Sequence, residues 1–254
     1  MGGMVDTPPL WRLMTGSALR RYREGMGYAL DDAAKILDCC PSKISRVETG
    51  QRGIRPRELR ELLSDYGVPP REQATLLQLA QLGRSQHSEV TACPPDRSIW
   101  MTASQILLYD ALQVPLLLQT PEYAREVGTA GGTPCAGVVP QVTAVVSEGA
   151  LRQMVGGAGV MHAQLGTLAA TKAVVQVLPF SSGARAAGCG VGSLAFLRFG
   201  EAPALDVVRV GGQYLLSDVD RASYLDLFEQ LQASALSPAA SAQMLRGMAE
   251  ALGA

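Results

Sequence analysis

The sequence predicts an α+β protein with two parts: a small all-α domain first and an α+β domain after it. Between residues 17 and 82, apolar residues recur at helical spacing between short breaks. Beyond residue 140, β-branched runs alternate with helical patterns. Residues 1–84 hold 13 Lys and Arg against 10 Asp and Glu, while residues 85–254 hold 9 against 13. A basic first part and an acidic remainder favour a division of labour in which the first part meets an anion.

Five short helices are expected in residues 1–84, each ended by a Gly, a Pro or a polar break. Ser17 is expected to cap the first helix, and Gly25 to end it. The five helical stretches are "ALRRYREG", "LDDAAKIL", "PSKISRVE", "RPRELRELLSDYG" and "PREQATLLQLAQLG". Five helices in this length predict a compact all-α domain.

A polar segment with a Pro-Pro pair, residues 85–98, is expected to link this domain to a second one over residues 99–254. The stretch "SIWMTASQILLYDALQVPLLLQTPEYAREV" predicts two helices broken at Pro115 and Pro121. Strands are expected at "QVTAVVSE", "AVVQVLPF", "GSLAFLRF" and "LDVVRVGG". Helices are expected at "GVMHAQLGTLAATK", at "DVDRASYLDLFEQLQASAL" with Asp218 as its cap, and from Ser237 to about Leu252. This order predicts a small mixed sheet packed with helices.

The composition argues against several classes of protein. No apolar run approaches the roughly 18 residues of a membrane span, so we expect no membrane partner. The first 16 residues lack a charged start followed by an apolar run, so no secretory signal is expected. The five cysteines form no Cys-x-x-Cys pair, and His87 and Cys93, which lie in the expected linker, are too few ligands for a zinc site. We therefore expect a cytoplasmic protein with no metal and no cofactor.

The stretch "LDDAAKILDCCPSKISRVETG" predicts a helix-turn-helix, because two helices flank a tight turn and the second is short and basic. Ile44 and Val47 are spaced to pack on the preceding helix. The side chains then facing outward, or lying in the loop that follows, are those expected to contact DNA bases and phosphates: Ser42, Lys43, Ser45, Arg46, Thr49, Arg52 and Arg55. The same pattern also fits a five-helix bundle with a solvated polar face.

The stretch "LRRYREGMG…AAKILDCCPSKISRVETGQRG" resembles regulators of the xenobiotic-response-element type, which have a lambda-repressor-like DNA-binding domain. The blocks "VPLLLQTPEYAREV", "VGGAGVMHAQLGTL", "VQVLPFSSGARAA" and "LSPAASAQMLRGMA" are similar to an actinobacterial branch whose C-terminal domain is described as antitoxin-like or of unknown function. The resemblance implies that residues 41–49 form the recognition helix. It also implies that Glu48 forms an internal ion pair with an Arg of the first helix.

The sequence departs from this family at both helices of the motif. The family opens the first motif helix with Thr-Gln, where Thr caps the helix and Gln meets phosphate. Here Ala29 and Leu30 stand in those positions. Asp38 tolerates the left-handed conformation of the turn, but Cys40 is a poor cap for a helix that begins at Pro41. The resemblance therefore implies a retained scaffold with two weakened anchors.

The C-terminal domain carries no catalytic signature. A few polar residues fall at the ends of predicted elements, where they line either a small-molecule pocket or internal ion pairs: Tyr123, Arg125, Glu148, Arg152, Arg185 and Cys189. His162 is expected to be a surface or hydrogen-bonded residue rather than a catalytic base.

We expect a DNA-binding transcriptional regulator that acts as a homodimer on double-stranded DNA. Its C-terminal domain would bind a small-molecule effector or a small protein partner. The alternative is a repurposed family member with impaired DNA binding that binds or converts a small metabolite. Ala29, Leu30 and Cys40 favour that alternative.

Overall fold

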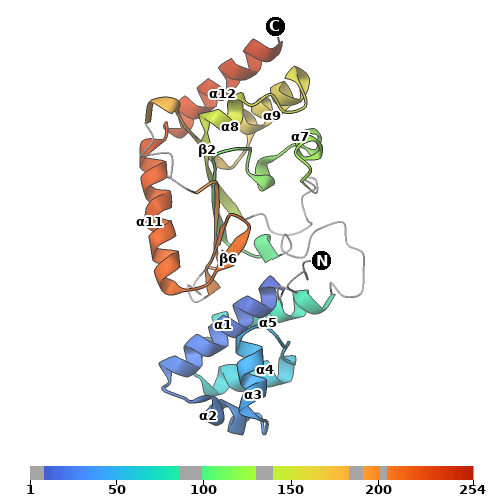
Figure 1. Ribbon diagram of the computed structural model, residues 1–254, viewed down its shortest axis with the longest axis vertical. Helices are drawn as coiled ribbons and strands as arrows, with labels where there is room; N and C mark the ends of the chain where they lie inside the picture. The colour runs from blue at the N-terminus through green and yellow to red at the C-terminus, as the bar shows by residue number, and fades with distance from the viewer. Residues whose placement is uncertain (1–8, 86–98, 130–139, 183–190, 201–204, 254) are drawn as a thin grey trace, which may run out of the picture. The chain divides into compact units, whose positions relative to one another are not determined.

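The computed structural model describes residues 9–85, 99–129, 140–182, 191–200 and 205–253 (Figure 1). The chain divides into two compact units. Met1–Ala103 and Arg198–Asp206 make up the first, called the helical unit here. Residues 104–197 and 207–254 make up the second, the sheet unit. The expected α+β class is confirmed, whereas the expected linker at 85–98 lies almost entirely outside the described residues.

Five helices form the helical unit: α1 (Leu10–Gly25), α2 (Leu30–Ile36), α3 (Pro41–Glu48), α4 (Pro56–Asp65) and α5 (Pro70–Ser85). Helix α1 begins well before the expected start, and Ser17 lies inside it. The reason is that Leu10, Trp11 and Met14 are buried and extend the apolar stripe toward the N-terminus.

Helices α1 and α3 pack closely because a glycine lies where they meet. A Cβ atom on Gly16 would lie 2.4 Å from the carbonyl oxygen of Val47 and 2.6 Å from that of Glu48. No side chain fits there without moving the backbone of α3. Leu59, Leu62 and Leu63 of α4 complete the interior with Leu76 and Leu79 of α5.

The sheet unit is built on one six-stranded mixed sheet with the order β3-β2-β1-β4-β5-β6. Its strands are β1 (Gln105–Asp110), β2 (Gln141–Ser147), β3 (Val174–Leu178), β4 (Ser193–Arg198), β5 (Val207–Val210) and β6 (Gln213–Leu215). Strands β1, β2 and β3 are parallel, while β5 pairs antiparallel with both β4 and β6. The described helices are α7 (Pro121–Glu126), α8 (Glu148–Arg152), α9 (Ala158–Ala170), α11 (Asp218–Ser234) and α12 (Pro238–Gly253), with short 3-10 turns η1 (Leu116–Leu118) and η2 (Phe180–Ser182).

Strand β1 corrects the prediction of two helices in residues 99–127. Only α7 after Pro121 is an α-helix of the expected kind, and "QILLYD" is a strand in the middle of the sheet. Five of its six residues are buried, so both faces are covered and the usual alternation of polar and apolar residues is absent. A short apolar run of this kind does not distinguish a buried strand from a buried helix.

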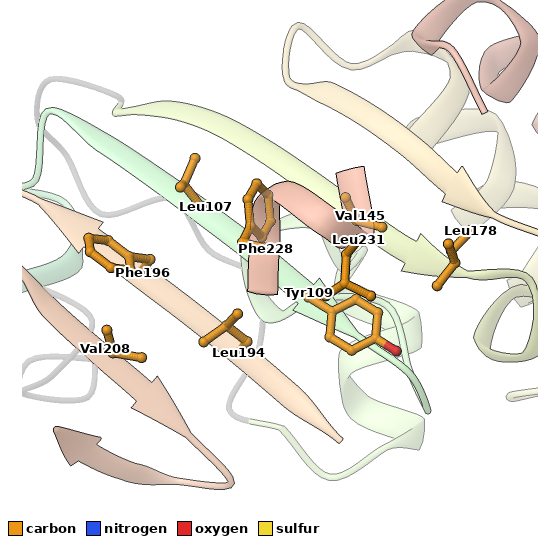
Figure 2. Packing of buried hydrophobic residues seen from close by; sticks show 9 residues of the cluster. All are labelled: Leu107, Tyr109, Val145, Leu178, Leu194, Phe196, Val208, Phe228 and Leu231. Atoms are coloured by element: carbon orange, nitrogen blue, oxygen red, sulfur yellow. The ribbon is translucent and has the colours of Figure 1, made fainter. Parts of the chain in front are cut away.

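Helix α11 covers one face of the sheet, as Figure 2 shows. Phe228 and Leu231 of α11 pack on side chains from five strands: Leu107 and Tyr109 of β1, Val145 of β2, Leu178 of β3, Leu194 and Phe196 of β4, and Val208 of β5. Helices α7, α8 and α9 lie on the other side of the sheet (Figure 1), and α12 packs against α9 and β3. The sheet is therefore a middle layer between helices.

The junction between α11 and α12 covers the outer edge of β3. The amide of Leu236 donates to the carbonyl of Val177 at 2.9 Å, and the amide of Val177 donates to the hydroxyl of Ser241 at the same distance. The side chain of Gln176 donates to Leu236 O and accepts from Gln232. These bonds satisfy the backbone groups that an edge strand leaves unpaired.

The two units differ in how their helices begin. In the sheet unit, the hydroxyls of Thr120, Ser147, Ser217 and Ser237 accept backbone N–H bonds at the starts of α7, α8, α11 and α12. The cap of α11 is therefore Ser217 and not Asp218, which is the first helical residue and pairs with Arg221. The residues preceding α1, α2, α3 and α4 are Pro9, Ala29, Cys40 and Arg55, and none makes a side-chain cap.

Candidate nucleic-acid interface

Helices α2 and α3 form the expected pair, joined by a turn at Asp38–Cys40. Asp38 has a φ of 46°, the left-handed conformation foreseen for it. The amide of Cys39 donates to the carbonyl of Ala34 at 2.9 Å, so the turn closes on the end of α2. This turn sets the direction in which α3 leaves α2.

The inner side of α3 is fixed by two apolar residues and a buried ion pair. Ile44 and Val47 are 2% and 3% exposed. Arg23 of α1 donates to both carboxylate oxygens of Glu48, through Nε at 2.7 Å and Nη2 at 2.9 Å. A further bond from Arg23 Nη1 reaches the carbonyl of Tyr28, and the bond to Glu48 raises the pKa of Arg23. Glu48 is thus paired with an Arg of the first helix.

The outer side of α3 and the loop after it carry exposed polar residues. Ser42, Arg46 and Thr49 are exposed on α3 and at its end, and Arg52 and Arg55 are exposed in the loop. Ser45 is half-buried. Arg46 Nε donates to the carbonyl of Ser42 at 3.2 Å, and the Thr49 hydroxyl donates to the carbonyl of Ser45. These bonds lie within one helix, so they hold the side chains along α3 without burying them.

Lys43 differs from its neighbours because it is engaged inside the protein. Its Nζ lies 2.8 Å from Glu58 Oε1 of α4, and the two side chains are only 16% and 23% exposed. Glu58 Oε2 also accepts from the amide of Arg55. Lys43 therefore ties α3 to α4. Sequence reasoning missed this contact because Glu58 lies fifteen residues away, on another helix.

The starts of α2 and α3 bear out the poor capping expected from Ala29 and Cys40. At α2, the side chain of Asp32 accepts from the amide of Ala29 at 3.0 Å. Ala29 has no side-chain acceptor, so the amides of the first turn of α2 receive no side-chain cap from it. At α3, Cys40 Sγ lies 3.2 Å from the Ser42 hydroxyl. Hydrogen bonds from Ser42 and from the amide of Lys43 lower the pKa of the exposed Cys40 thiol, whereas burial raises that of Cys39.

Of the candidate pocket residues of the sheet unit, Tyr123, Arg125, Glu148 and Arg152 lie in the described part of the chain. Tyr123 is fully buried, and its hydroxyl accepts from the amide of Val114 at 3.1 Å. Glu148 accepts from Arg152 Nε at 2.7 Å and from the amide of Phe180 at 2.9 Å. Arg125 is exposed. Arg185 and Cys189 lie outside the described residues. Glu148 and Arg152 are thus paired along α8, with the Arg152 side chain 57% exposed.

A different pocket in the sheet unit lies where α8, α9 and α12 meet. Its volume is about 220 Å³, and its lining residues are Leu151, Arg152, Gln153, Met154, Met161, Met248, Ala251 and Leu252. Arg152 is the one predicted pocket residue among them. Beside it, His162 Nδ1 lies 2.8 Å from the carbonyl of Ala249, so this histidine is hydrogen-bonded as expected.

In the described residues, no group of three or more His, Cys, Asp or Glu side chains lies close enough together to hold a metal ion. No helix in the described part of the chain is both long and apolar enough to cross a membrane.

Comparison with known families defines the class first. Residues 15–76 match a family model described as a helix-turn-helix domain, which supports a DNA-binding regulator. Residues 135–247 match a second model, described only as a domain of unknown function (DUF5753). Comparison with curated proteins gives no significant match, and neither does comparison with solved structures.

Proposed function

We propose that this protein is a sequence-specific transcriptional regulator that binds double-stranded DNA as a homodimer. The observation that carries the proposal is the two-sided character of α3. Its inner side is locked by Ile44, Val47 and the Glu48–Arg23 pair, while its outer side presents exposed hydrogen-bonding residues. A short helix held rigidly on one side and polar on the other suits insertion into the major groove.

The exposed residues suit two different kinds of DNA contact. Arg46 is exposed in the last turn of α3, and an Arg there could donate two hydrogen bonds to O6 and N7 of a guanine. Ser42, in the first turn, reaches either a base edge or a phosphate. Arg52 and Arg55, in the loop after α3, suit contacts with the phosphate backbone, which set position without reading sequence. Lys43 must first leave Glu58 to take part.

The short length of α3 supports a homodimer. One α3 spans eight residues and reaches only a few base pairs. Two copies related by a two-fold axis would read half-sites about one helical turn apart, which accounts for both affinity and specificity.

Substitution of Arg46 tests the proposal. We expect Arg46→Ala to lower affinity for the best genomic fragment about 5- to 150-fold, because one bidentate base contact contributes about 1–3 kcal/mol of discrimination. Affinity for random duplex should change far less. Arg20→Ala is the matched control, because Arg20 is an exposed arginine of α1 that pairs with Glu24. Equal affinity of wild type and Arg46→Ala for the selected fragment would contradict the proposal.

A second candidate function, binding of a small apolar effector, is favoured by the pocket between α8, α9 and α12. Three methionines line it, and their flexible thioethers adapt to ligands of varied shape. Ala251 is its smallest lining side chain, so Ala251→Phe would place a ring in the space. Compounds that raise the melting temperature of the wild type should then fail to raise that of the variant. Equal shifts in both proteins would rule this pocket out.

A further inference from the structure

Arg12, in the first turn of α1, has a buried Nε with no hydrogen-bond partner among the residues that the structure describes. Its Cζ lies 5.2 Å from the ring centroid of Trp11, so an aromatic face covers part of the cation. Buried N–H groups nearly always have an acceptor, and an arginine carries five donors in a planar fork suited to oxyanions. The arrangement points to an acceptor that comes from outside the chain.

Arg12 lies against the loop that follows the recognition helix. A Cβ atom on Gly53 would be 3.8 Å from Arg12 Nε and 3.6 Å from Trp11 Cη2, so the backbone of Gly53 rests beside the guanidinium. The same loop lies close to α1 at Gly50. A side chain at Gly50 is excluded by its φ of 73° and by Leu13, because an added Cβ would lie 3.0 Å from Leu13 Cδ2. Gly53 is exposed and bears no side chain, so no side chain of its own stands between solvent and Arg12.

Gly53 belongs to the exposed loop that also carries Arg52 and Arg55. We infer that Arg12 is a further phosphate-contacting residue, which binds a backbone phosphate of double-stranded DNA at Gly53. This inference rests on the proposed function, and it adds a contact from α1 that lies outside the helix-turn-helix pair. Glycine allows a phosphate to approach the backbone closely, and phosphate contacts carry much of the affinity in such interfaces.

Arg12 is also easier to recruit than Lys43. The Lys43 ammonium must give up a 2.8 Å bond to Glu58 before it meets DNA. Turning the Arg12 guanidinium toward a phosphate breaks no hydrogen bond at Nε, because none exists. A phosphate therefore gains a charge-assisted contact from Arg12 in exchange for part of the contact between the guanidinium and the Trp11 ring.

The salt dependence of DNA binding tests this role. Fluorescently labelled duplex would be titrated with full-length Arg12→Gln, Arg12→Lys and wild type between 50 and 200 mM salt. Loss of one phosphate contact lowers the slope of log K against log salt by about 0.9, so the Arg12→Gln defect should be about 3-fold larger at 50 than at 200 mM. Arg12→Lys should keep most of the wild-type slope. The control Arg20→Gln removes the same charge from an exposed position of α1 and should leave the slope unchanged.

A second pair of variants avoids altering α1. Gly53→Asp places a carboxylate beside Arg12 without backbone strain, because Gly53 has no positive φ and its Cβ would make only ordinary contacts. It should lower the slope at least as much as Arg12→Gln, while Gly53→Asn should affect it less. Unchanged slopes in both Arg12→Gln and Gly53→Asp, with normal wild-type binding, would overturn the role of Arg12 alone. Absence of wild-type binding to any duplex would overturn the proposed function and the role of Arg12 together.

Discussion

The helices of the two units begin in different ways. Four helices of the sheet unit start with a Ser or Thr hydroxyl that accepts a backbone N–H bond, as Ser217 does for Asp220. Helices α1 to α4 of the helical unit start at Pro9, Ala29, Cys40 and Arg55, with no such bond. Four of the five described helices of the sheet unit satisfy an end amide internally, while α9 begins after Gly157 with no side-chain cap. The helical unit leaves several end amides to solvent or to an external acceptor.

The helical unit must therefore draw its stability from its interior. The pair Arg23–Glu48 joins α1 to α3, and Lys43–Glu58 joins α3 to α4. Both contacts hold α3 in place, the first against α1 and the second against α4. The comparison suggests that the ends of α2 and α3 can be improved without disturbing the interface, whereas the interior tolerates little change.

The largest effect is expected from breaking the buried ion pair. Glu48→Ala leaves the Arg23 guanidinium buried, with the carbonyl of Tyr28 and a longer 3.4 Å contact to Glu24 as its remaining acceptors, which should cost about 3–5 kcal/mol of unfolding free energy. Denaturant unfolding followed by tryptophan fluorescence measures this, because Trp11 and Trp100 both belong to the helical unit. The double variant Arg23→Met/Glu48→Leu should lose less. A loss below about 1 kcal/mol for Glu48→Ala would show that the pair is not what holds α3.

A smaller loss is expected from removing a cap in the sheet unit. Ser217→Ala deletes the hydroxyl that accepts from the amide of Asp220, which should destabilise α11 by about 1 kcal/mol. Hydrogen-exchange mass spectrometry of the peptide that begins α11 would detect it as faster exchange. Ser234→Ala, at the other end of the same helix, is the control. Equal exchange rates in the two variants would show that the Ser217 hydroxyl does not stabilise the start of α11.

A gain is expected when a cap is added to the recognition helix. Cys40→Ser supplies a hydroxyl at the start of α3, where a neutral thiol is only a weak acceptor for the amide of Lys43, and should stabilise the helical unit by about 0.5–1 kcal/mol at pH 7. Tryptophan-detected unfolding measures the difference from wild type. A loss of stability instead would mean that the thiol contributes more than its geometry indicates.

The smallest effect is a pH dependence of that gain. Hydrogen bonds from Ser42 and the amide of Lys43 lower the pKa of Cys40 in the folded protein, so the folded state favours the thiolate. This contribution is absent at low pH and grows as pH rises toward the ordinary thiol range. The advantage of Cys40→Ser over wild type should therefore shrink between pH 7 and pH 9. A constant difference would show that the thiolate does not cap α3.

Residues with a local cause were predictable from the sequence. The outward residues of α3, the φ of Asp38, the buried Ile44 and Val47, and the poor caps at Ala29 and Cys40 all follow from spacing or from one residue's chemistry. The resemblance to a known family added the pairing of Glu48 with an Arg of α1. Each of these depends on a few neighbouring positions.

Features set by distant parts of the chain were not predictable. Strand β1 reads like a helix because its neighbours β2 and β4 and the layers on both faces bury it. Strand β6 is too short, at three residues, to give a pattern. The Lys43–Glu58 bond and the place of Arg12 beside Gly53 join residues 15 and 41 positions apart. Nothing in the local sequence marks such contacts.

The α11–α12 junction limits how two copies of the sheet unit could pair edge to edge through their strands. Because Leu236 and Ser241 occupy the backbone groups of Val177, the β3 edge accepts no further strand there. Pairing through the sheet is left to β6, at the opposite end of the strand order. Two copies that paired through β6 about a two-fold axis would present a β3 edge at each end of the joined sheet. Sheet pairing of this kind would therefore stop at two copies.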